Sequence, residues 1–390
     1  MGSDALQSGH SIDNRVPADE AVVASAERRT LSRERRKARG AFTHSTLPGA
    51  GDPRDWDLLA GTARWPTQSH AFVDALAATM LVGETVVTHR ITDRTGTAAL
   101  IAMCRGPAWL ARRRLVGARE IYEPVDALCR DPAAAEALAG ALVRDPRPLV
   151  LDRVPAGSPL VGALTRAMRG RGVVIVRPAT GCPTLALDAG WREPEARFNA
   201  GRRSDFRRAE RRAAALGPLV HDVHVPDERT LGPLFDEAIA VEARSWKREA
   251  GSAILADPPK EAFFRRYLGA AAARGQVRIS FLRIGGQAVA MQIALAAPGR
   301  LWLLKIGYDE EFARVSPGTL LMLRTLAHAA SEGCTAVEFL GDVEPWIAAL
   351  WTRDSHSCVR VAAYPASVRG LIALAGDTAV WARDRLGRRG

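Results

Sequence analysis

The sequence predicts two successive α/β domains, each built on a mixed sheet with helices beside it. The chain has 390 residues, more than one hydrophobic core comfortably fills. Apolar residues make up 47% of the chain, which is enough for two ordinary cores. One order of elements also occurs twice: antiparallel strands, a helix and a further strand.

The second half shows this order most clearly. Three apolar runs are separated by turns that contain glycine, and they predict an antiparallel meander. A helix then ends at Gly333, and a largely apolar strand follows it. The predicted elements are strands over 277–284, 287–296 and 301–309, a helix over 317–332 and a strand over 335–341.

The first half repeats the order more loosely. A hairpin and a short third strand precede a helix that Asp131 and Pro132 begin. Sequence identity between the two halves is not evident, so we infer the duplication from the order of elements alone. The predicted elements are strands over 85–91 and 97–104 and near Leu115, a helix over 131–143, a strand over 148–154 and a helix over 159–168.

Composition divides the chain into five segments. Residues 1–50 mix Ser, Asp, Pro and Gly with a basic run, which favours a disordered, solvated tail over one that binds nucleic acid or anionic lipid. The last segment predicts a basic amphipathic helix that docks on the protein, with a membrane surface as the alternative. The other boundaries give domains over 51–195 and 218–365, an arginine-rich linker helix over 196–217 and the last segment over 366–390.

The formal charge of +11 favours an anionic partner such as CoA, a nucleotide sugar, tRNA or an acidic membrane. The five cysteines include no CxxC pair, and His221 and His224 point to opposite faces of a predicted strand, so we expect no metal. The chain starts without an apolar leader, and no apolar run approaches about 18 residues. We therefore expect a cytoplasmic protein with no transmembrane segment.

The linker helix carries most of its arginines away from its apolar face. Ser204 is the expected N-cap, and Phe206 and Ala213 lie on the apolar stripe. A solvated arginine face is the commoner arrangement, and an anionic ligand is the alternative.

Glu242 interrupts an apolar helical stripe. In a helix that begins near Pro233, Phe235, Ile239, Glu242 and Trp246 share one face. A buried carboxylate without a partner costs several kcal/mol, so Glu242 needs a cation or a role. Lys247, Lys305 and a substrate amine are the candidates, and a structural ion pair is equally consistent with the pattern.

The helix predicted at 317 has a start suited to an anion. Ser316 is expected to cap it and Pro317 to occupy its first turn. The amides of Gly318, Thr319 and Leu320 are then free to meet a negative charge, which the helix dipole favours.

Four segments together carry a family resemblance: the arginine-rich linker helix, EARSWK at 242–247, LLKIGYDEEFARVSPG at 303–318 and EFLGD at 338–342. Over about residues 195–360 the chain resembles the GNAT acetyltransferases associated with bacterial cellulose and exopolysaccharide biosynthesis. That family is itself similar to the tandem-domain Fem-type transferases.

The resemblance implies two tandem GNAT-like acyltransferase domains and an acyl-CoA-dependent N-acyltransferase. Acetyl-CoA or another acyl-CoA would be the co-substrate, with its pyrophosphate on the amides of residues 318–320 and beside Arg314. Proline at 317 stands where the family's loop has its first glycine, which leaves fewer amides available. A carrier-protein pantetheine or an aminoacyl-tRNA is the alternative donor.

The resemblance also suggests roles for side chains. Glu338 is the first expected general base, because the acceptor amine must lose a proton before it attacks the thioester. Asp342 is the second, with Glu242 behind it, and Tyr308 is expected to donate a proton to the leaving thiolate. Substrate binding falls to Lys305, Trp246, Lys247 and Asp309.

The acceptor implied is a small-molecule or sugar-linked amine. An aminoacyl-tRNA-dependent ligase is the second hypothesis, in which the basic linker and tail bind tRNA in a salt-sensitive way. A non-catalytic factor of polysaccharide assembly is the third. The protein is expected in the cytoplasm, with a location at the periphery of the inner membrane as an extension of that reading.

Overall fold

The structure is a computed structural model that describes residues 42–245, 251, 253–297 and 299–387. Trp246 and Lys247 lie outside these residues, as does most of the predicted tail. Strand β1 (Thr43–Pro48) pairs with β2 (Thr85–Asp93), so the tail predicted over 1–50 extends too far toward the C-terminus.

The first half contains the predicted elements. A proline starts each of α4 and α5, and the side chains of Asp131 and Ser158 cap them. Two helices that we did not predict precede the hairpin: α2 (Pro53–Leu59) and α3 (His70–Thr79). The others are β2 (Thr85–Asp93), β3 (Gly96–Arg105), β4 (Arg113–Leu115), β5 (Leu128–Cys129), α4 (Pro132–Leu142), β6 (Leu149–Pro155) and α5 (Pro159–Ala167).

The second half repeats this order, which confirms the predicted succession of a meander, a helix and a strand. The predicted bounds agree closely with those observed, except that the last strand is shorter than predicted. The elements are β8 (Leu219–His224), α7 (Leu231–Ala243), α8 (Pro258–Ala272), β9 (Val277–Ile284), β10 (Gln287–Ala297), β11 (Arg300–Tyr308), α9 (Pro317–Ser331), β12 (Ala336–Glu338) and α10 (Pro345–Leu350).

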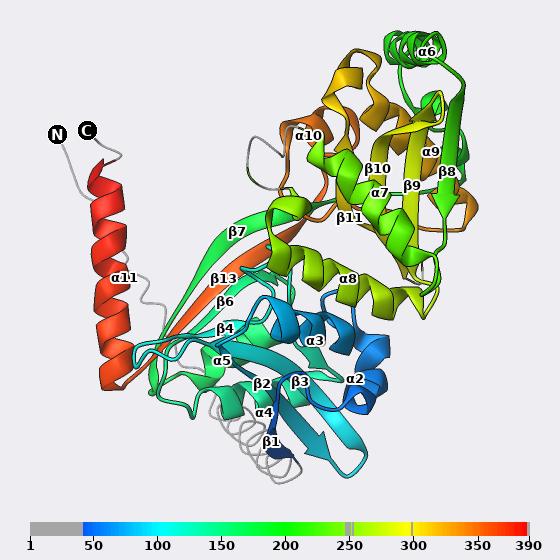
Figure 1. Cartoon of the computed structure of the whole chain (residues 1–390). Coiled ribbons are helices and arrows are strands. Elements are labelled where there is room, and N and C mark those ends of the chain that lie inside the picture. The colour runs from blue at the N-terminus through cyan, green and yellow to red at the C-terminus, as the bar shows by residue number, and fades with distance from the viewer. Residues whose placement is uncertain (1–41, 246–250, 252, 298, 388–390) are drawn as a thin grey trace, which may run out of the picture. The chain divides into compact units, whose positions relative to one another are not determined.

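The two halves exchange strands, which the sequence did not predict. Strand β13 (Ser355–Pro365) follows the second half in the chain, yet it lies between β6 and β7 (Gly172–Ala186) of the first half. The end of β7 in turn pairs with β12. One continuous sheet results, in the order β1-β2-β3-β4-β6-β13-β7-β12-β11-β10-β9-β8 (Figure 1).

Helices cover both faces of the second half's sheet. α7 and α8 pack on the face that carries Met291 and Ile293, whereas α9 packs on the face that carries Ala294 and Leu303. α8 also lies beside α3 of the first half (Figure 1), with the ring of Phe72 meeting Phe263 and Tyr267 at centroid distances of 5.6 and 5.4 Å. One hydrophobic core therefore extends through both halves.

The linker helix is α6 (Ala200–Ala214), and its N-cap differs from the predicted one. Asn199 caps it by accepting a 2.9 Å hydrogen bond from the amide of Arg202. Ser204 instead lies within the first turns of the helix. Because asparagine is as good a cap as serine, the sequence offered two starts and the earlier one is used.

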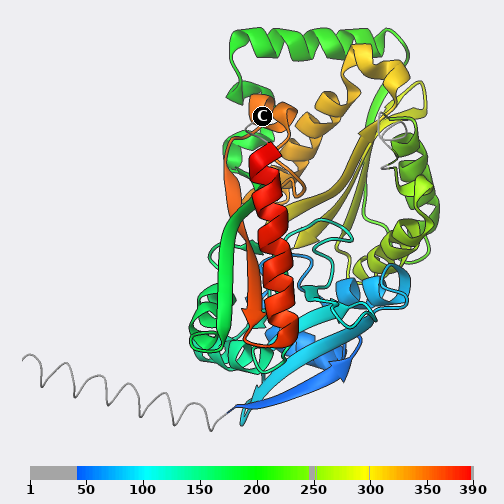
Figure 2. The same ribbon diagram turned by 90° about the vertical axis from the view of Figure 1, so that its left-hand side faces the viewer.

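The C-terminal helix α11 (Val368–Gly387) docks mainly through its first half. Ala373 is buried, and Asp377 binds both guanidinium nitrogens Nη1 and Nη2 of Arg112 at 2.6 Å. Farther along, Arg177 of β7 lies over the Trp381 ring, and the helix runs beside β7 and β13 (Figure 2). The docking that we predicted is present, while Leu371, Ile372 and Trp381 remain exposed.

Val361 of β13 tests the strand exchange. Its side chain is fully buried between Leu151 of β6 and Val176 of β7. We expect Val361→Ala to cost on the order of 2 kcal/mol of unfolding free energy, because it opens a cavity in both halves' shared sheet. Urea unfolding followed by circular dichroism and tryptophan fluorescence should show one transition, shifted equally in both signals. Arg360→Ala, at the exposed neighbouring position, is the control, and two separated transitions would contradict the shared sheet.

Candidate active site

Two neighbouring strands of the second half diverge. β11 and β12 pair in parallel only from Arg300 to Trp302, opposite residues 336–338. β11 then continues to Tyr308, and the register with β10 slips at Leu304, which forms a β-bulge. A bulge bends a strand and redirects its side chains, so the strands open a wedge at this point.

The N-terminus of α9 stands at the far end of that wedge. Ser316 has a left-handed backbone with φ 50°, and its side chain caps nothing. Its carbonyl accepts hydrogen bonds from the amides of Thr319 and Leu320, each at 3.1 Å. The prediction of three free amides is therefore wrong. Of these three amides, only that of Gly318 has no partner within the described residues.

The loop before α9 is fixed by Asp309. This carboxylate is buried, forms a 2.6 Å ion pair with Arg244 of α7 and caps the short helix η5 (Glu310–Val315). Both oxygens of Asp309 are thereby engaged in positioning the loop, which leaves little for the predicted substrate contact. Arg314, at the end of the same loop, is exposed and available to a ligand.

Glu338 lies where the strands begin to diverge, and its carboxylate is buried. Oε1 pairs with Arg300, and Oε2 lies 3.0 Å from Nε2 of His356 on β13. Trp65 of the first half packs its ring on His356 and on Trp302, each at a centroid distance of 5.3 Å. His356 thus belongs to the site through its contacts with Glu338 and Trp65.

Glu242 of α7 and Lys305 of β11 lie on the same side of the sheet, which α7 and α8 cover. Glu242 is fully buried, as predicted, and its Oε2 accepts a 3.0 Å hydrogen bond from the amide of Ile254. The Lys305 ammonium lies 5.3 Å from the centre of the Phe264 ring. Gly307 allows α7 close to the strand, because a side chain there would press against Glu242 at about 3.1 Å.

The first half supplies a buried carboxylate that sequence reasoning missed. Oε2 of Glu123 accepts a 3.0 Å hydrogen bond from the amide of Gly341, just after β12. Arg153 of β6 donates to the carbonyl of the same glycine at 2.6 Å. Glu123 stands in a loop with no periodicity or motif, so no signal in the sequence marked it.

Burial raises the pKa of Glu123 to about 7. The Gly341 amide, Arg153 and Lys305 act in the opposite direction, while exposed Asp342 raises the pKa further. Two predicted residues, Lys305 and Asp342, therefore lie within electrostatic range of Glu123. The structure thus brings Lys305 and Asp342 of the second half near Glu123, a carboxylate of the first half.

Tyr308 lies apart from these groups. It faces α9, where its ring would touch a side chain placed at Gly318 at about 3.2 Å. Along β11 it is about 20 Å beyond Trp302, the neighbour of Glu338. The two ends of the wedge thus carry separate groups, and Tyr308 cannot share one reacting centre with Glu338.

Strained backbone gathers at these same two places. Four described residues other than glycine have a left-handed backbone: Tyr122, Arg153, Ser316 and Leu340. Arg153 binds the carbonyl of Tyr122 and that of Gly341, which follows Leu340, and Ser316 begins α9. Such conformations cost on the order of 1–3 kcal/mol each and concentrate at functional sites.

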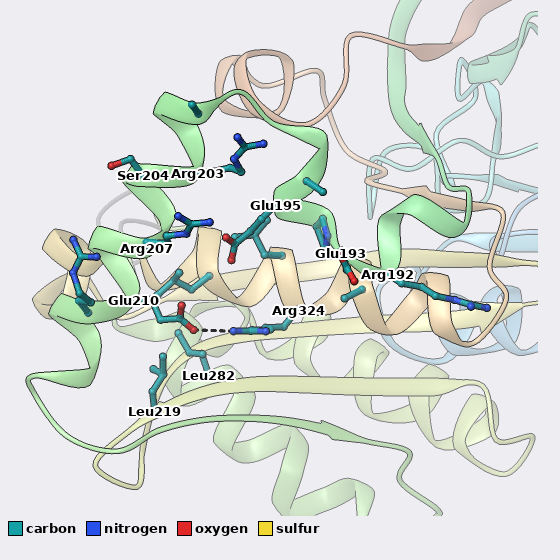
Figure 3. Close-up of a pocket in the computed structure, with 17 residues that line it drawn as sticks. Arg192, Glu193, Glu195, Arg203, Ser204, Arg207, Glu210, Leu219, Leu282 and Arg324 are labelled. Atoms are coloured by element: carbon teal, nitrogen blue, oxygen red, sulfur yellow. Dashed lines mark hydrogen bonds and ion pairs between the residues drawn. The ribbon is translucent and has the colours of Figure 1, made fainter.

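Apart from the wedge, a cavity of about 710 Å³ lies between α6 and α9. Arg203 and Arg207 point from α6 across it (Figure 3), and Arg324 of α9 forms a 2.7 Å ion pair with Glu210. Arg207 has no ion-pair partner among the residues that the structure describes. Five arginines line the cavity against three glutamates, which leaves it net positive.

Comparison with known proteins agrees with this geometry. Residues 200–346 match the family model described as an acetyltransferase (GNAT) domain. The fold is similar to that of FemX, with 10% identity and a TM-score of 0.51 over 80% of this chain and 95% of that one. A conserved protein of unknown function from Bacteroides thetaiotaomicron VPI-5482 matches with 11% identity and a TM-score of 0.51, over 82% and 99% of the two chains.

No curated protein matches the chain. Residues 200–346 are thus similar to a GNAT acetyltransferase domain, and the chain has the mixed α/β fold that the sequence predicts. In the described residues, no helix has the length and apolar character to cross a membrane, and no three metal-binding side chains gather.

Glu123→Gln tests the burial of this carboxylate without reference to function. Because folding raises the pKa of Glu123 from 4.5 to about 7, the folded state binds more protons between these pH values, and wild-type stability falls as pH rises through them. Glutamine does not titrate. We expect the variant to be more stable by about 3 kcal/mol above pH 7 and to match the wild type below about pH 4.5, as measured by urea unfolding. A pH-independent difference would contradict the assignment.

Proposed function

We propose that this protein is an N-acyltransferase that uses an acyl-CoA and an amine. The observation that supports it most is the wedge between β11 and β12, which opens toward the N-terminus of α9 within the residues that match the GNAT model. The wedge offers unpaired strand backbone at one end and a positive helix dipole at the other. Those features suit an extended thioester with a phosphorylated end.

The residues at α9 fit the phosphates of CoA with a reduced cradle. The Gly318 amide, the helix dipole and the exposed Arg314 guanidinium would bind them. Pro317 has no amide to offer, and those of Thr319 and Leu320 are engaged within the turn. When bound, the acyl-CoA supplies an activated carbonyl, so the protein needs to orient the two substrates and accept a proton.

Glu338 and Asp342 have different surroundings, and we propose different roles for them. Both oxygens of Glu338 are engaged by Arg300 and His356, so we propose that Glu338 fixes the narrow end of the wedge. Asp342 is exposed beside Glu123 and stays a proposed acid–base group. Glu242 holds the segment after α7 through Ile254 and is proposed as a positioning residue.

The acceptor that we propose is an amine of a small molecule or a polysaccharide precursor. The link to exopolysaccharide synthesis rests on the resemblance of residues 195–360 to that branch of the GNAT acetyltransferases. A cytoplasmic location agrees with an acyl-CoA donor. The exposed apolar residues of α11, with its arginines, agree with a location at the inner membrane's surface.

The cavity between α6 and α9 favours a second ligand. Its unpaired arginines and its volume of about 710 Å³ suit a small anionic molecule, as the linker helix suggested. The alternative function, an aminoacyl-tRNA-dependent ligase, would use the outer arginines of α6 as well. These two uses of α6 differ in which arginines matter.

Donor binding is tested by thermal unfolding with millimolar acetyl-CoA. A ligand at about 100 times its dissociation constant adds about 2.7 kcal/mol of stability, so the melting temperature should rise. Arg314→Glu should abolish most of this rise, because it reverses the charge of the exposed side chain that we propose to bind the phosphates. Arg383→Glu, the same change on α11, should leave it intact. The proposal fails if acetyl-CoA and free CoA both leave the wild-type melting temperature unchanged.

Arg207→Ala and Arg208→Ala separate the two anionic ligands. Arg207 lines the cavity, while Arg208 does not. For a small anion, we expect calorimetry with pyrophosphate to show roughly tenfold weaker binding in Arg207→Ala only. For tRNA, both variants should weaken binding about equally and reduce its dependence on salt. Pyrophosphate affinity equal in all three proteins would exclude the cavity as an anion site.

A further inference from the structure

A small cavity lies between the two halves, where β11 and β12 diverge. Leu304 and Leu340 line it from the second half's sheet, Phe264 and Tyr267 from α8, and Glu123 from the first half. Its volume of about 10 Å³ matches one group the size of a water molecule. Among the described residues that line it, Glu123 alone is charged.

The Glu123 carboxylate can accept further hydrogen bonds. Oε2 accepts the hydrogen bond from Gly341, but Oε1 accepts none within the described residues. Glu123 also forms no ion pair there, although its residue is only 8% exposed. A buried carboxylate without a cation is costly, and a cation brought by a ligand would offset that cost.

The surroundings of Glu123 hold it in place. Gly341 binds Glu123 through its amide and Arg153 through its carbonyl, so the segment after β12 is fixed from both sides. Tyr122, beside Glu123, and Leu340, beside Gly341, both have left-handed backbones. This strain persists only where surrounding contacts impose it, which is typical of a preorganised site.

We propose that this cavity binds the ammonium group of the acceptor and that the Glu123 carboxylate takes its first proton. This inference rests on the acyl transfer proposed above and adds its acceptor site. The ammonium gives one proton to Glu123 and becomes a neutral amine. Its lone pair forms the new C–N bond as the C–S bond breaks, the second nitrogen proton passes to the thiolate sulfur, and Glu123 later releases its proton to water.

The cavity also restricts the substrate class. A cavity that holds one group the size of a water molecule accommodates –NH₃⁺ but not a methylated ammonium. The aromatic rings of Phe264 and Tyr267 favour an apolar stem on the amine. We therefore expect an unhindered primary amine on a methylene carbon to bind better than an amine on a sugar ring carbon.

The charged groups around Glu123 set the pH dependence. They are Arg153 from β6, Lys305 from β11 and Asp342 from the loop after β12. Together with burial, they leave the carboxyl with a pKa of about 7. An alkylammonium stays protonated to about pH 10, as lysine does, so amine affinity should rise with pH through 7 and then level off.

The test is calorimetric binding of hexylamine without any acyl donor. We expect Glu123→Gln to weaken binding at least tenfold at pH 8 and to remove the rise in affinity between pH 6 and 8. Asp126→Asn is the matched control, because Asp126 is a half-buried carboxyl with a raised pKa that does not line the cavity. N,N-dimethylhexylamine should bind the wild type at least tenfold more weakly than hexylamine.

Equal hexylamine affinity in the wild type and Glu123→Gln would overturn the inference, whatever the outcome with acetyl-CoA. Hexylamine binding that depends on Glu123 without acetyl transfer would contradict the proposed function and leave the amine site standing. If the protein does transfer an acetyl group to hexylamine, Glu123→Gln should lower kcat/KM by about 100-fold or more. Glu123→Asp, which keeps the charge but shortens the side chain, should recover part of both binding and rate.

Discussion

The strand exchange is the constraint on which the rest of this structure depends. Because β13 completes the first half's sheet and β7 pairs with β12, neither half can form its complete sheet alone. The exchange fixes the distance between the halves. It brings Glu123 and Arg153 to the backbone of Gly341 and His356 to Glu338. The candidate active site is therefore built by both halves, although the GNAT match covers only residues 200–346.

In the proposed acyl transfer, the wedge between β11 and β12 would separate the binding of the donor's phosphates from that of the amine. At the α9 end, a strained Ser316, the Gly318 amide and Arg314 suit phosphates. At the narrow end, carboxylates and aromatic rings suit an amine. The loop that joins β11 to α9 is held by the ion pair of Asp309 with Arg244, which follows α7. A change in either partner would therefore act at the α9 end.

Local patterns predicted most elements, and contacts distant in sequence were missed. The meander over 277–309 and the helix that begins at Pro317 have strong periodicity and clear starts, so their bounds were nearly right. β7 was missed because Pro178 and Pro183 argue against a strand. The structure resolves this, since β7 is paired by β13 on one side and by β12 only over its last residues. Glu242 was found because it breaks an apolar stripe, whereas nothing local marked Glu123.

The position of β13 near the end of the chain has a consequence for synthesis. Domains at the start of a chain usually fold while the ribosome is still translating the rest. Here, the edges of β6 and β7 stay open until residues 355–365 have left the ribosome. The nascent first half therefore carries two unpaired strand edges while the intervening residues 187–354 are made, and open edges of this kind invite pairing with other chains. A chaperone that covers these edges until β13 emerges would protect the unfinished chain from such pairing.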